Sequence, residues 1–206
     1  MELVDVIVCA HNEEATIFQV VTAIMGSHYR RYCVVVADSC TDKTVEVARN
    51  AGAHVVEVAA GNKGSAMAYG LRYVSTRDIA FVDADLEGLQ VRHIDALLTW
   101  APGWMVVGIR DGHHSSLGRF PSISGERRVP RRLAEEVRLT GTGWKAELIL
   151  NAACMKAGIP WAHVLMRGVK NPRRNKPDEW LKVTAAALEH AGPLSRMLAN
   201  TRKVRP

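Results

Sequence analysis

The chain has 206 residues, 48% of them hydrophobic and 23% charged, which are values of a globular protein large enough to bury a core. No apolar stretch approaches the roughly 20 residues of a membrane-spanning helix, and the acidic start, with Glu2 and Asp5, is unlike a signal peptide. These features predict a cytoplasmic protein without a transmembrane segment. The four cysteines lack C-x-x-C spacing, and Cys9 and Cys33 lie in apolar runs, which predicts reduced core thiols.

Charge is divided unevenly along the chain. Residues 1–109 carry 8 Lys and Arg against 13 Asp and Glu, whereas residues 110–206 carry 19 against 8, and the net charge is +6. A basic second half predicts an anionic partner, for which a phosphorylated acceptor, a membrane surface and a nucleic acid all stay open. The basic residues lack the interleaved aromatic side chains expected of a protein that binds single-stranded nucleic acid.

Short apolar runs alternate with segments whose apolar residues recur at helical spacing. Strands are predicted at residues 4–8, 34–36, 54–58, 79–82, 105–109 and 163–166, and helices at residues 17–25, 43–50, 64–74, 91–100, 131–139, 144–157 and 177–190. This alternation predicts βαβ units and a parallel sheet with right-handed crossovers. Residues 112–124 are predicted to form a long mobile loop.

The most informative stretch runs from Ala80 to Glu87, where an apolar strand ends abruptly at Asp83 and Asp85. The carboxyl ends of strands are where open α/β sheets bind ligands. Two neighbouring carboxylates would repel if both were buried, so they predict a compensating cation, and Mg²⁺ or Mn²⁺ suits oxygen ligands. Glu87 is placed to reach the same ion. Taken alone, two such aspartates also fit a solvated acidic turn.

Four motifs follow one another along the chain: V-I-V-C-A-H-N-E-E, V-V-V-A-D-S-C-T-D-K-T, G-N-K-G-S-A-M-A-Y-G-L and F-V-D-A-D-L. A weaker fifth is S-G-E-R, residues 124–127. Together they resemble the family 2 glycosyltransferases, enzymes of the GT-A fold, over residues 4 to about 189. Within that family the D-A-D-L stretch resembles polyprenyl-phosphate mannose synthases, and the tail R-G-V-K-N-P-R-R-N-K-P-D-E-W-L is similar to that of glucosyl-3-phosphoglycerate synthases.

The resemblance implies a single GT-A domain, with a Rossmann-like, mostly parallel sheet flanked by helices. Its nucleotide-sugar-binding half would span residues 1–109, its helical acceptor-side half residues 110–190, and a basic tail residues 191–206. The implied activity is metal-dependent transfer of a sugar from a UDP- or GDP-linked donor to an anionic acceptor. The resemblance implies donor contacts for Ala10, His11, Glu13, Asp38, Lys63, Asp83 and Ala84, ligation of Mg²⁺ or Mn²⁺ by Asp85, Asp83 and Glu87, and catalytic roles for Asp85, Glu147 and Arg127.

Some positions depart from the family pattern. Cys9 replaces a usual proline, and Ala37 replaces the first aspartate of a usual pair, which leaves base selectivity open. Glu147 is the single carboxylate in residues 140–150, where many inverting relatives have a Glu-Asp pair that supplies a general base. An acceptor that is already an anion needs no base. Accordingly, Arg127, Arg128 and the basic loop 167–176 are predicted to bind its phosphate.

Simpler interpretations stand beside these roles. Asp38 fits an Asx turn, Lys63 an exposed loop lysine, and Glu147 a helix residue that orients a neighbour. The alternative functions are a nucleotidyltransferase, a glycosyltransferase acting on DNA, and a non-catalytic nucleotide- or nucleic-acid-binding module. A nucleotidyltransferase would need a first loop rich in glycine and basic residues, and residues 9–14 contain neither. A homodimer also stays open.

Overall fold

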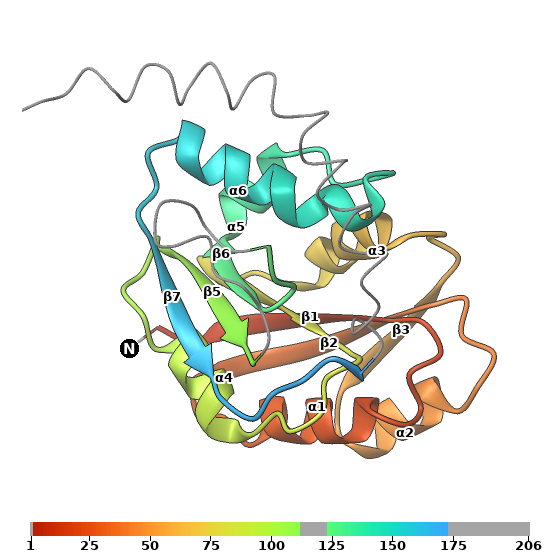
Figure 1. The fold of residues 1–206 in the computed structure, drawn as a ribbon. Coiled ribbons are helices and arrows are strands. Elements are labelled where there is room, and N and C mark those ends of the chain that lie inside the picture. The colour runs from red at the N-terminus through yellow and green to blue at the C-terminus, as the bar shows by residue number, and fades with distance from the viewer. Residues whose placement is uncertain (1, 112–122, 173–206) are drawn as a thin grey trace, which may run out of the picture. The chain divides into compact units, whose positions relative to one another are not determined.

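The computed structural model of the protein describes residues 2–111 and 123–172. Strands and helices alternate through most of this chain (Figure 1). The strands are β1 (Val4–Ala10), β2 (Arg30–Asp38), β3 (His54–Val58), β4 (Asp78–Asp83), β5 (Met105–Arg110), β6 (Arg127–Pro130) and β7 (Trp161–Met166). The helices are α1 (Ile17–Met25), α2 (Thr44–Asn50), α3 (Lys63–Gly70), α4 (Val91–Leu98), α5 (Arg131–Glu136) and α6 (Ala146–Lys156), with short 3₁₀ turns η1 (Leu71–Tyr73) and η2 (Gly143–Lys145).

The strands form one mostly parallel sheet of seven strands, in the order β3-β2-β1-β4-β6-β5-β7. Strand β6 is the exception, since it runs antiparallel to both of its neighbours and places Arg127 opposite Phe81 of β4. The sequence pattern missed β6 because it has only four residues and begins with two arginines, so no apolar run marks it. Strands from the two predicted halves of the chain therefore share one sheet, which confirms the expected single-domain α/β fold.

Helices cover both faces of the sheet: α1, α2 and α4 lie on one side, and α3, α5 and α6 on the other (Figure 1). The central parts of β1, β2, β4 and β5 are apolar because successive side chains enter different cores. In β1, Val6 and Val8 join the core under α1, whereas Ile7 joins the core under α3. In β4, Val82 and Phe81 divide in the same way. Burial on both faces fixes the register that brings the strand ends into line.

Most predicted elements are present with adjusted ends. The expected helix 131–139 stops at Glu136, the helix expected at 144–157 begins as the turn η2 before α6, and the last strand starts two residues before His163. The helix expected at 177–190, most of the loop expected at 112–124 and the tail from residue 173 lie outside the described residues. In the described ranges, the helices are all too short or too polar to cross a bilayer.

Asp5 links β1 to β2 and to the loop before β4 at the amino-terminal edge of the sheet. Its buried carboxylate accepts hydrogen bonds from the backbone N–H groups of Ser75 and Thr76, and it forms a two-bond ion pair with Arg31 at 2.8 Å. Replacing Asp5 with alanine is expected to lower the free energy of unfolding by about 1–3 kcal/mol, because two N–H groups lose their acceptor. Glu57→Ala is the matched control: its ion pair with Arg49 is exposed and contributes about 0–1 kcal/mol.

The same carboxylate gives the stability a defined pH dependence. Burial opposes ionisation of Asp5, but the hydrogen bonds from Arg31, Ser75 and Thr76 outweigh it and lower the pKa of this carboxyl below its ordinary value. Stability from these contacts is therefore complete above the unfolded-state pKa of about 3.9 and is lost as the pH falls through the lower folded-state pKa. Urea unfolding at pH 7 and at steps below pH 4 should show the difference between wild type and Asp5→Ala shrinking with acid. A difference that stays constant would contradict this account.

Candidate active site

The loops that follow β1 and β2 are bonded to each other at the carboxyl edge of the sheet. His11 Nδ1 donates to the Asp38 carbonyl at 2.6 Å, and the Thr41 N–H donates to Asn12 Oδ1 at 2.8 Å. The Glu13 N–H donates to Thr44 Oγ1 at 2.7 Å. The structure therefore brings the predicted donor-binding residues of the first loop onto the end of β2, with Ala10 as the last residue of β1. Because these hydrogen bonds hold the two loops together, the loops can present backbone and side-chain groups to a nucleotide without a change of conformation.

Asp38 ties the end of β2 to the loop that leads to Lys63. One carboxylate oxygen accepts from the N–H groups of Ala60 at 2.8 Å and Gly61 at 3.1 Å, and from the Ser39 hydroxyl. An Asx turn would bond to the backbone two residues on, so that simpler interpretation is wrong. The predicted contact between Asp38 and a base stays a prediction. The hydrogen bonds of Asp38 connect the second sequence motif, at the end of β2, to the start of the third motif at Gly61.

Lys63 lies between two buried carboxylates, which makes it the centre of the site. Its Nζ is 2.5 Å from Asp83 Oδ1 and 2.6 Å from Glu147 Oε1. The exposed fractions of the three side chains are 14% for Lys63, 8% for Asp83 and 2% for Glu147, so Lys63 is not an exposed loop lysine. Two carboxylates brought together in a buried site need a positive charge between them. Glu147 orients Lys63, which agrees with the interpretation of that glutamate as a residue that positions a neighbour.

The start of α3 is held where Lys63 can make both contacts. Asn62 caps the helix by accepting from the Ser65 N–H, and the same oxygen accepts from the Gly143 N–H at 3.2 Å. A side chain on Gly64 would overlap the Thr142 hydroxyl and the Leu139 carbonyl, so only glycine lets α3 approach this turn. The third motif and the turn before Glu147 therefore pack as one unit, although about 80 residues separate them.

Gly125 lies directly against the carboxylate of Asp83. A methyl group built on Gly125 would overlap both oxygens of Asp83, so the position accepts no larger residue unless that carboxylate moves. The glycine of the S-G-E-R motif is therefore required for steric reasons, which the sequence alone did not indicate. The glycine leaves room for an aspartate that faces Lys63. The available signal was the Ser-Gly step itself, but its partner lies 42 positions earlier in the chain.

Arg127 and Arg128 occupy the interior and not an acceptor surface. Both side chains are buried, and their guanidinium groups are engaged by the protein. Arg127 donates to the Ser124 carbonyl, the Glu147 carbonyl and Asn151 Oδ1. Arg128 pairs with Asp78 at 2.6 Å and donates to the carbonyl of Leu98, the last residue of α4, and to the Trp100 carbonyl just beyond it. The predicted contact with an acceptor phosphate is thus corrected: β6 inserts between β4 and β5 and carries both arginines inside.

Arg127 is consequently a positioning residue. It holds the carbonyl before Gly125 and the first turn of α6, which carries Glu147, and so fixes the two segments on either side of Asp83. Burial lowers the pKa of Arg127, while the nearby carboxylates of Glu147 and Asp83 oppose that shift. Cys9, on β1, is a free, half-buried cysteine, and desolvation raises the pKa of its thiol to about 12.

The three carboxylates predicted as metal ligands are placed differently from one another. Asp83 is turned inward to Lys63, Asp85 is half-buried at the edge, and Glu87 is exposed. Within residues 2–111 and 123–172 no three side chains of metal-ligating type converge, so the trio is not assembled as predicted. The ammonium group of Lys63 lies against Asp83 and so supplies part of the positive charge that this buried carboxylate needs. Asp85 still fits Mg²⁺ or Mn²⁺, since such ions are commonly held by one or two carboxylates together with substrate phosphates.

A backbone bridge joins the loop after Asp85 to the segment that follows β7. Glu87 and Lys170 exchange two hydrogen bonds, at 2.9 and 3.0 Å. Gly88 has a φ of +73° and lies so close to the Gly168 carbonyl that a side chain would overlap it. The basic segment 167–170 is therefore anchored beside the aspartates, and the Arg167 and Lys170 side chains are exposed there.

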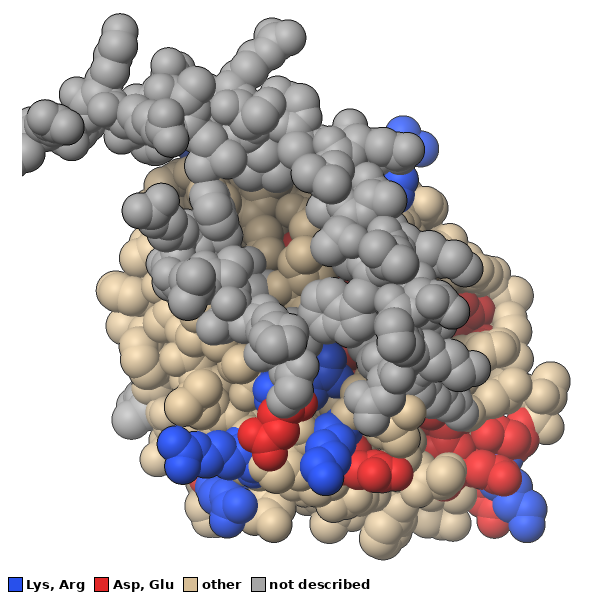
Figure 2. All heavy atoms as spheres, viewed as in Figure 1, with Lys and Arg blue, Asp and Glu red and all other residues tan. Residues whose placement is uncertain are grey.

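The described part of the chain carries no net charge. Residues 2–111 and 123–172 contain 18 Lys and Arg and 18 Asp and Glu, and the other nine basic and three acidic residues belong to 112–122 and 173–206. Figure 2 shows both signs interspersed along the lower part of one face and no single basic patch there. On this face the described residues give no support to a nucleic-acid interface, which needs a continuous positive surface.

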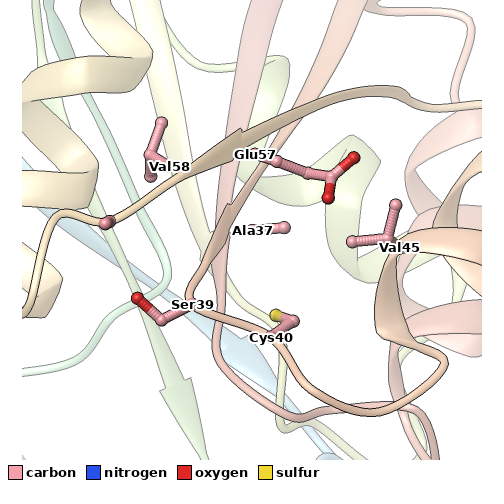
Figure 3. Close-up of a pocket in the computed structure, with 7 residues that line it drawn as sticks. Ala37, Ser39, Cys40, Val45, Glu57 and Val58 are labelled. Carbon is pink, nitrogen blue, oxygen red and sulfur yellow. The ribbon is translucent and has the colours of Figure 1, made fainter.

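A pocket opens beside α2, where β2 and β3 end, but the predicted residues do not line it. Figure 3 shows Glu57 directed toward Val45 of α2, with Ala37 and Cys40 beneath. Ala37 of β2 pairs with Glu57 of β3, and both side chains point to the α2 side of the sheet. Asp38 follows Ala37 along β2, so its side chain points to the opposite face, the α3 side, where Lys63 lies. The ionisable groups predicted to act on a substrate lie in the charged cluster around Lys63 and not in this pocket.

Comparison with solved structures defines the class of the fold. A glucosyl-3-phosphoglycerate synthase from Mycobacterium tuberculosis, in complex with Mn²⁺ and UDP-glucose, superposes with a TM-score of 0.75 at 24% identity over 95% of this chain and 79% of its own. The complex of that enzyme with Mn²⁺, UDP and phosphoglyceric acid gives 0.73 at 24% identity over 93% and 79%. A further mycobacterial protein gives 0.72 at 23% identity over 85% and 68%. These likenesses establish the GT-A fold.

The family follows from the sequence match. The model of glycosyl transferase family 2 matches residues 5–139, about two thirds of the chain, and the chain belongs to that family. The 4,4'-diaponeurosporenoate glycosyltransferase of Staphylococcus aureus is 33% identical over 99 residues, and that of Staphylococcus haemolyticus is 29% identical over 102. The matched segments cover 45% and 46% of this chain but only about a quarter of those relatives' own length.

Proposed function

We propose that this chain is a metal-dependent glycosyltransferase that moves a sugar from a UDP- or GDP-linked donor to an anionic acceptor carrying phosphate. The observation that carries the proposal is Lys63 between Asp83 and Glu147, next to Asp85, at the carboxyl edge of a family 2 sheet. In the transfer, the bond between the anomeric carbon and the diphosphate oxygen breaks. The nucleoside diphosphate leaves, and an oxygen of the acceptor bonds to that carbon.

Each part of the edge has a role in this reaction. The hydrogen-bonded loops at His11 and Asp38 would hold the nucleoside, and Lys63 would present a fixed positive charge beside the diphosphate. Asp85 would hold the ion, and a bound Mg²⁺ or Mn²⁺ would neutralise the charge that develops on the leaving diphosphate. Fixed charges of this kind need no rearrangement during the reaction, which is the main source of their catalytic effect.

Two observations support an acceptor that carries phosphate. Exposed Arg167 and Lys170 are anchored beside the loop of Asp85 by the bridge to Glu87. The M. tuberculosis enzyme of similar fold is described with phosphoglyceric acid bound. If the attacking oxygen belongs to the ionised phosphate itself, it carries no proton and needs no general base, which agrees with Glu147 being committed to Lys63.

The test is a panel of UDP-glucose, UDP-N-acetylglucosamine and GDP-mannose, each with Mn²⁺ and with or without 3-phosphoglycerate, scored by release of nucleoside diphosphate. One donor should give metal-dependent release that the phosphorylated acceptor accelerates. Asp85→Asn should lower that rate by about 10²-fold or more. Glu46→Gln, an exposed carboxylate on α2, is the control and should leave it unchanged. Release that does not depend on metal, or that ignores Asp85, would refute the proposal.

A further inference from the structure

Trp144 presents a large apolar surface next to the charged cluster. It lies in η2, just before α6, and with an exposed fraction of 59% it is the most exposed tryptophan in the described ranges. Lys63 Nζ lies 5.2 Å from the centroid of its ring, within the range of a cation–π contact. An exposed indole beside a charged cluster offers a flat apolar face to a ligand that reaches that cluster.

The backbone around Trp144 is held in place. The Gly143 N–H donates to Asn62, the Thr142 N–H donates to the Leu139 carbonyl, and the Lys145 N–H donates to the Thr142 carbonyl. The segment that carries the ring is therefore fixed to the start of α3, which carries Lys63. A ring on a fixed segment can bind a partner with little loss of conformational entropy.

Glu147 supplies a polar group next to this apolar face. Its Oε1 is bonded to Lys63, whereas its Oε2 is buried and has no hydrogen-bond partner among the described residues. A buried carboxylate oxygen without a partner is costly unless a ligand completes it. One turn of helix separates Glu147 from Trp144, so an aromatic face and a hydrogen-bond acceptor belong to the same short segment.

We infer that Trp144 is the platform against which the transferred sugar packs, with Glu147 Oε2 accepting a hydrogen bond from one of its hydroxyl groups. A pyranose ring has a face of C–H groups and a rim of hydroxyls, so it needs both an aromatic surface and a nearby acceptor. The diphosphate proposed beside Lys63 would deliver the sugar of the donor to this point. The inference rests on the proposed function and adds the group that contacts the sugar.

Calorimetric titration with Mn²⁺ separates the sugar from the nucleotide, using UDP-glucose against UDP and GDP-mannose against GDP. Trp144→Ala should weaken binding of the nucleotide-sugar about tenfold and leave the matching nucleoside diphosphate within twofold, while Trp144→Phe should retain most of the affinity. Trp100→Ala is the matched control, since that indole is partly exposed and packs against Trp104 away from Lys63. It should change neither affinity.

The remaining outcomes overturn the inference in distinguishable ways. If Trp144→Ala weakens nucleotide-sugar and nucleoside diphosphate equally, the ring acts through Lys63 or the nucleotide and not on the sugar. If donor affinity is unchanged while the KM of the acceptor rises, the ring serves the acceptor. If the wild-type protein binds every nucleotide-sugar and its nucleotide equally well, no sugar subsite exists. If it binds neither, the proposed function itself fails and this inference falls with it.

Discussion

Replacing Lys63 with methionine is expected to slow donor turnover strongly and to lower the free energy of unfolding by about 3–5 kcal/mol. The substitution keeps the length of the side chain but leaves Asp83 and Glu147 facing each other without a cation. Breaking a buried ion pair from one side has this cost because the remaining charge is desolvated and uncompensated. The rate should fall by about 10²-fold or more, since a fixed charge beside the diphosphate is lost.

A double-mutant cycle separates the two effects. In the Lys63→Met background, Glu147→Gln removes one of the two uncompensated charges, so it should restore about 0.5–3 kcal/mol of stability without restoring turnover. Chemical denaturation measures the first quantity, and release of nucleoside diphosphate measures the second. Lys43→Met, at an exposed lysine before α2, is the control for loss of a positive charge and should alter neither. Additive effects of the two substitutions on stability would show that Lys63 and Glu147 are not coupled.

Gly125→Ala is expected to lower turnover by about 10²-fold through displacement of Asp83. The new methyl group overlaps both carboxylate oxygens, so the aspartate must turn away from Lys63 or the strand must shift. Overpacking of this kind costs about 1–3 kcal/mol of stability, which leaves a folded protein whose site is misassembled. The nucleotide-sugar panel with Mn²⁺ measures the rate, and thermal unfolding measures how much folded protein remains.

The matched substitution is Gly26→Ala, at a glycine whose backbone also lies outside the left-handed region. A methyl group there meets a methyl of Val91, a partly exposed side chain on the far side of the sheet from Lys63. Gly26→Ala should therefore change stability alone and leave turnover per folded molecule intact. If Gly125→Ala behaves in the same way, the close contact between Gly125 and Asp83 has no functional meaning.

The parts of the site that depend on local pattern could be predicted from the sequence. The apolar run before Asp83 marks a buried strand and its carboxyl end, and the ordered motifs place His11, Asp38 and Lys63 at the same edge. These inferences succeed because strand ends in a parallel sheet meet at one edge whatever the connecting helices do. The fold class follows from the same alternation.

What the sequence pattern missed depends on contacts between distant segments. Glu147, one of the two carboxylate partners of Lys63, is 84 positions away in the sequence, and nothing near it indicates that its carboxylate will meet an amine. Arg127 and Arg128 lie in a segment without an apolar run, so their charge suggested a surface, and only the insertion of β6 between β4 and β5 buries them. The exposure of Trp144 likewise depends on how η2 packs on α3, which no periodicity reports.

The bridge between Glu87 and Lys170 bears on where the working unit of this protein ends. The family match stops at residue 139, yet the loop that carries Asp85 is closed by two backbone bonds from a segment 31 residues further on. A fragment cut at the family boundary would lose β7 as well as the strand-like partner of that loop. Fragment design, domain grafting and the delineation of recombination points in this chain should therefore treat everything up to Asn171 as one indivisible piece.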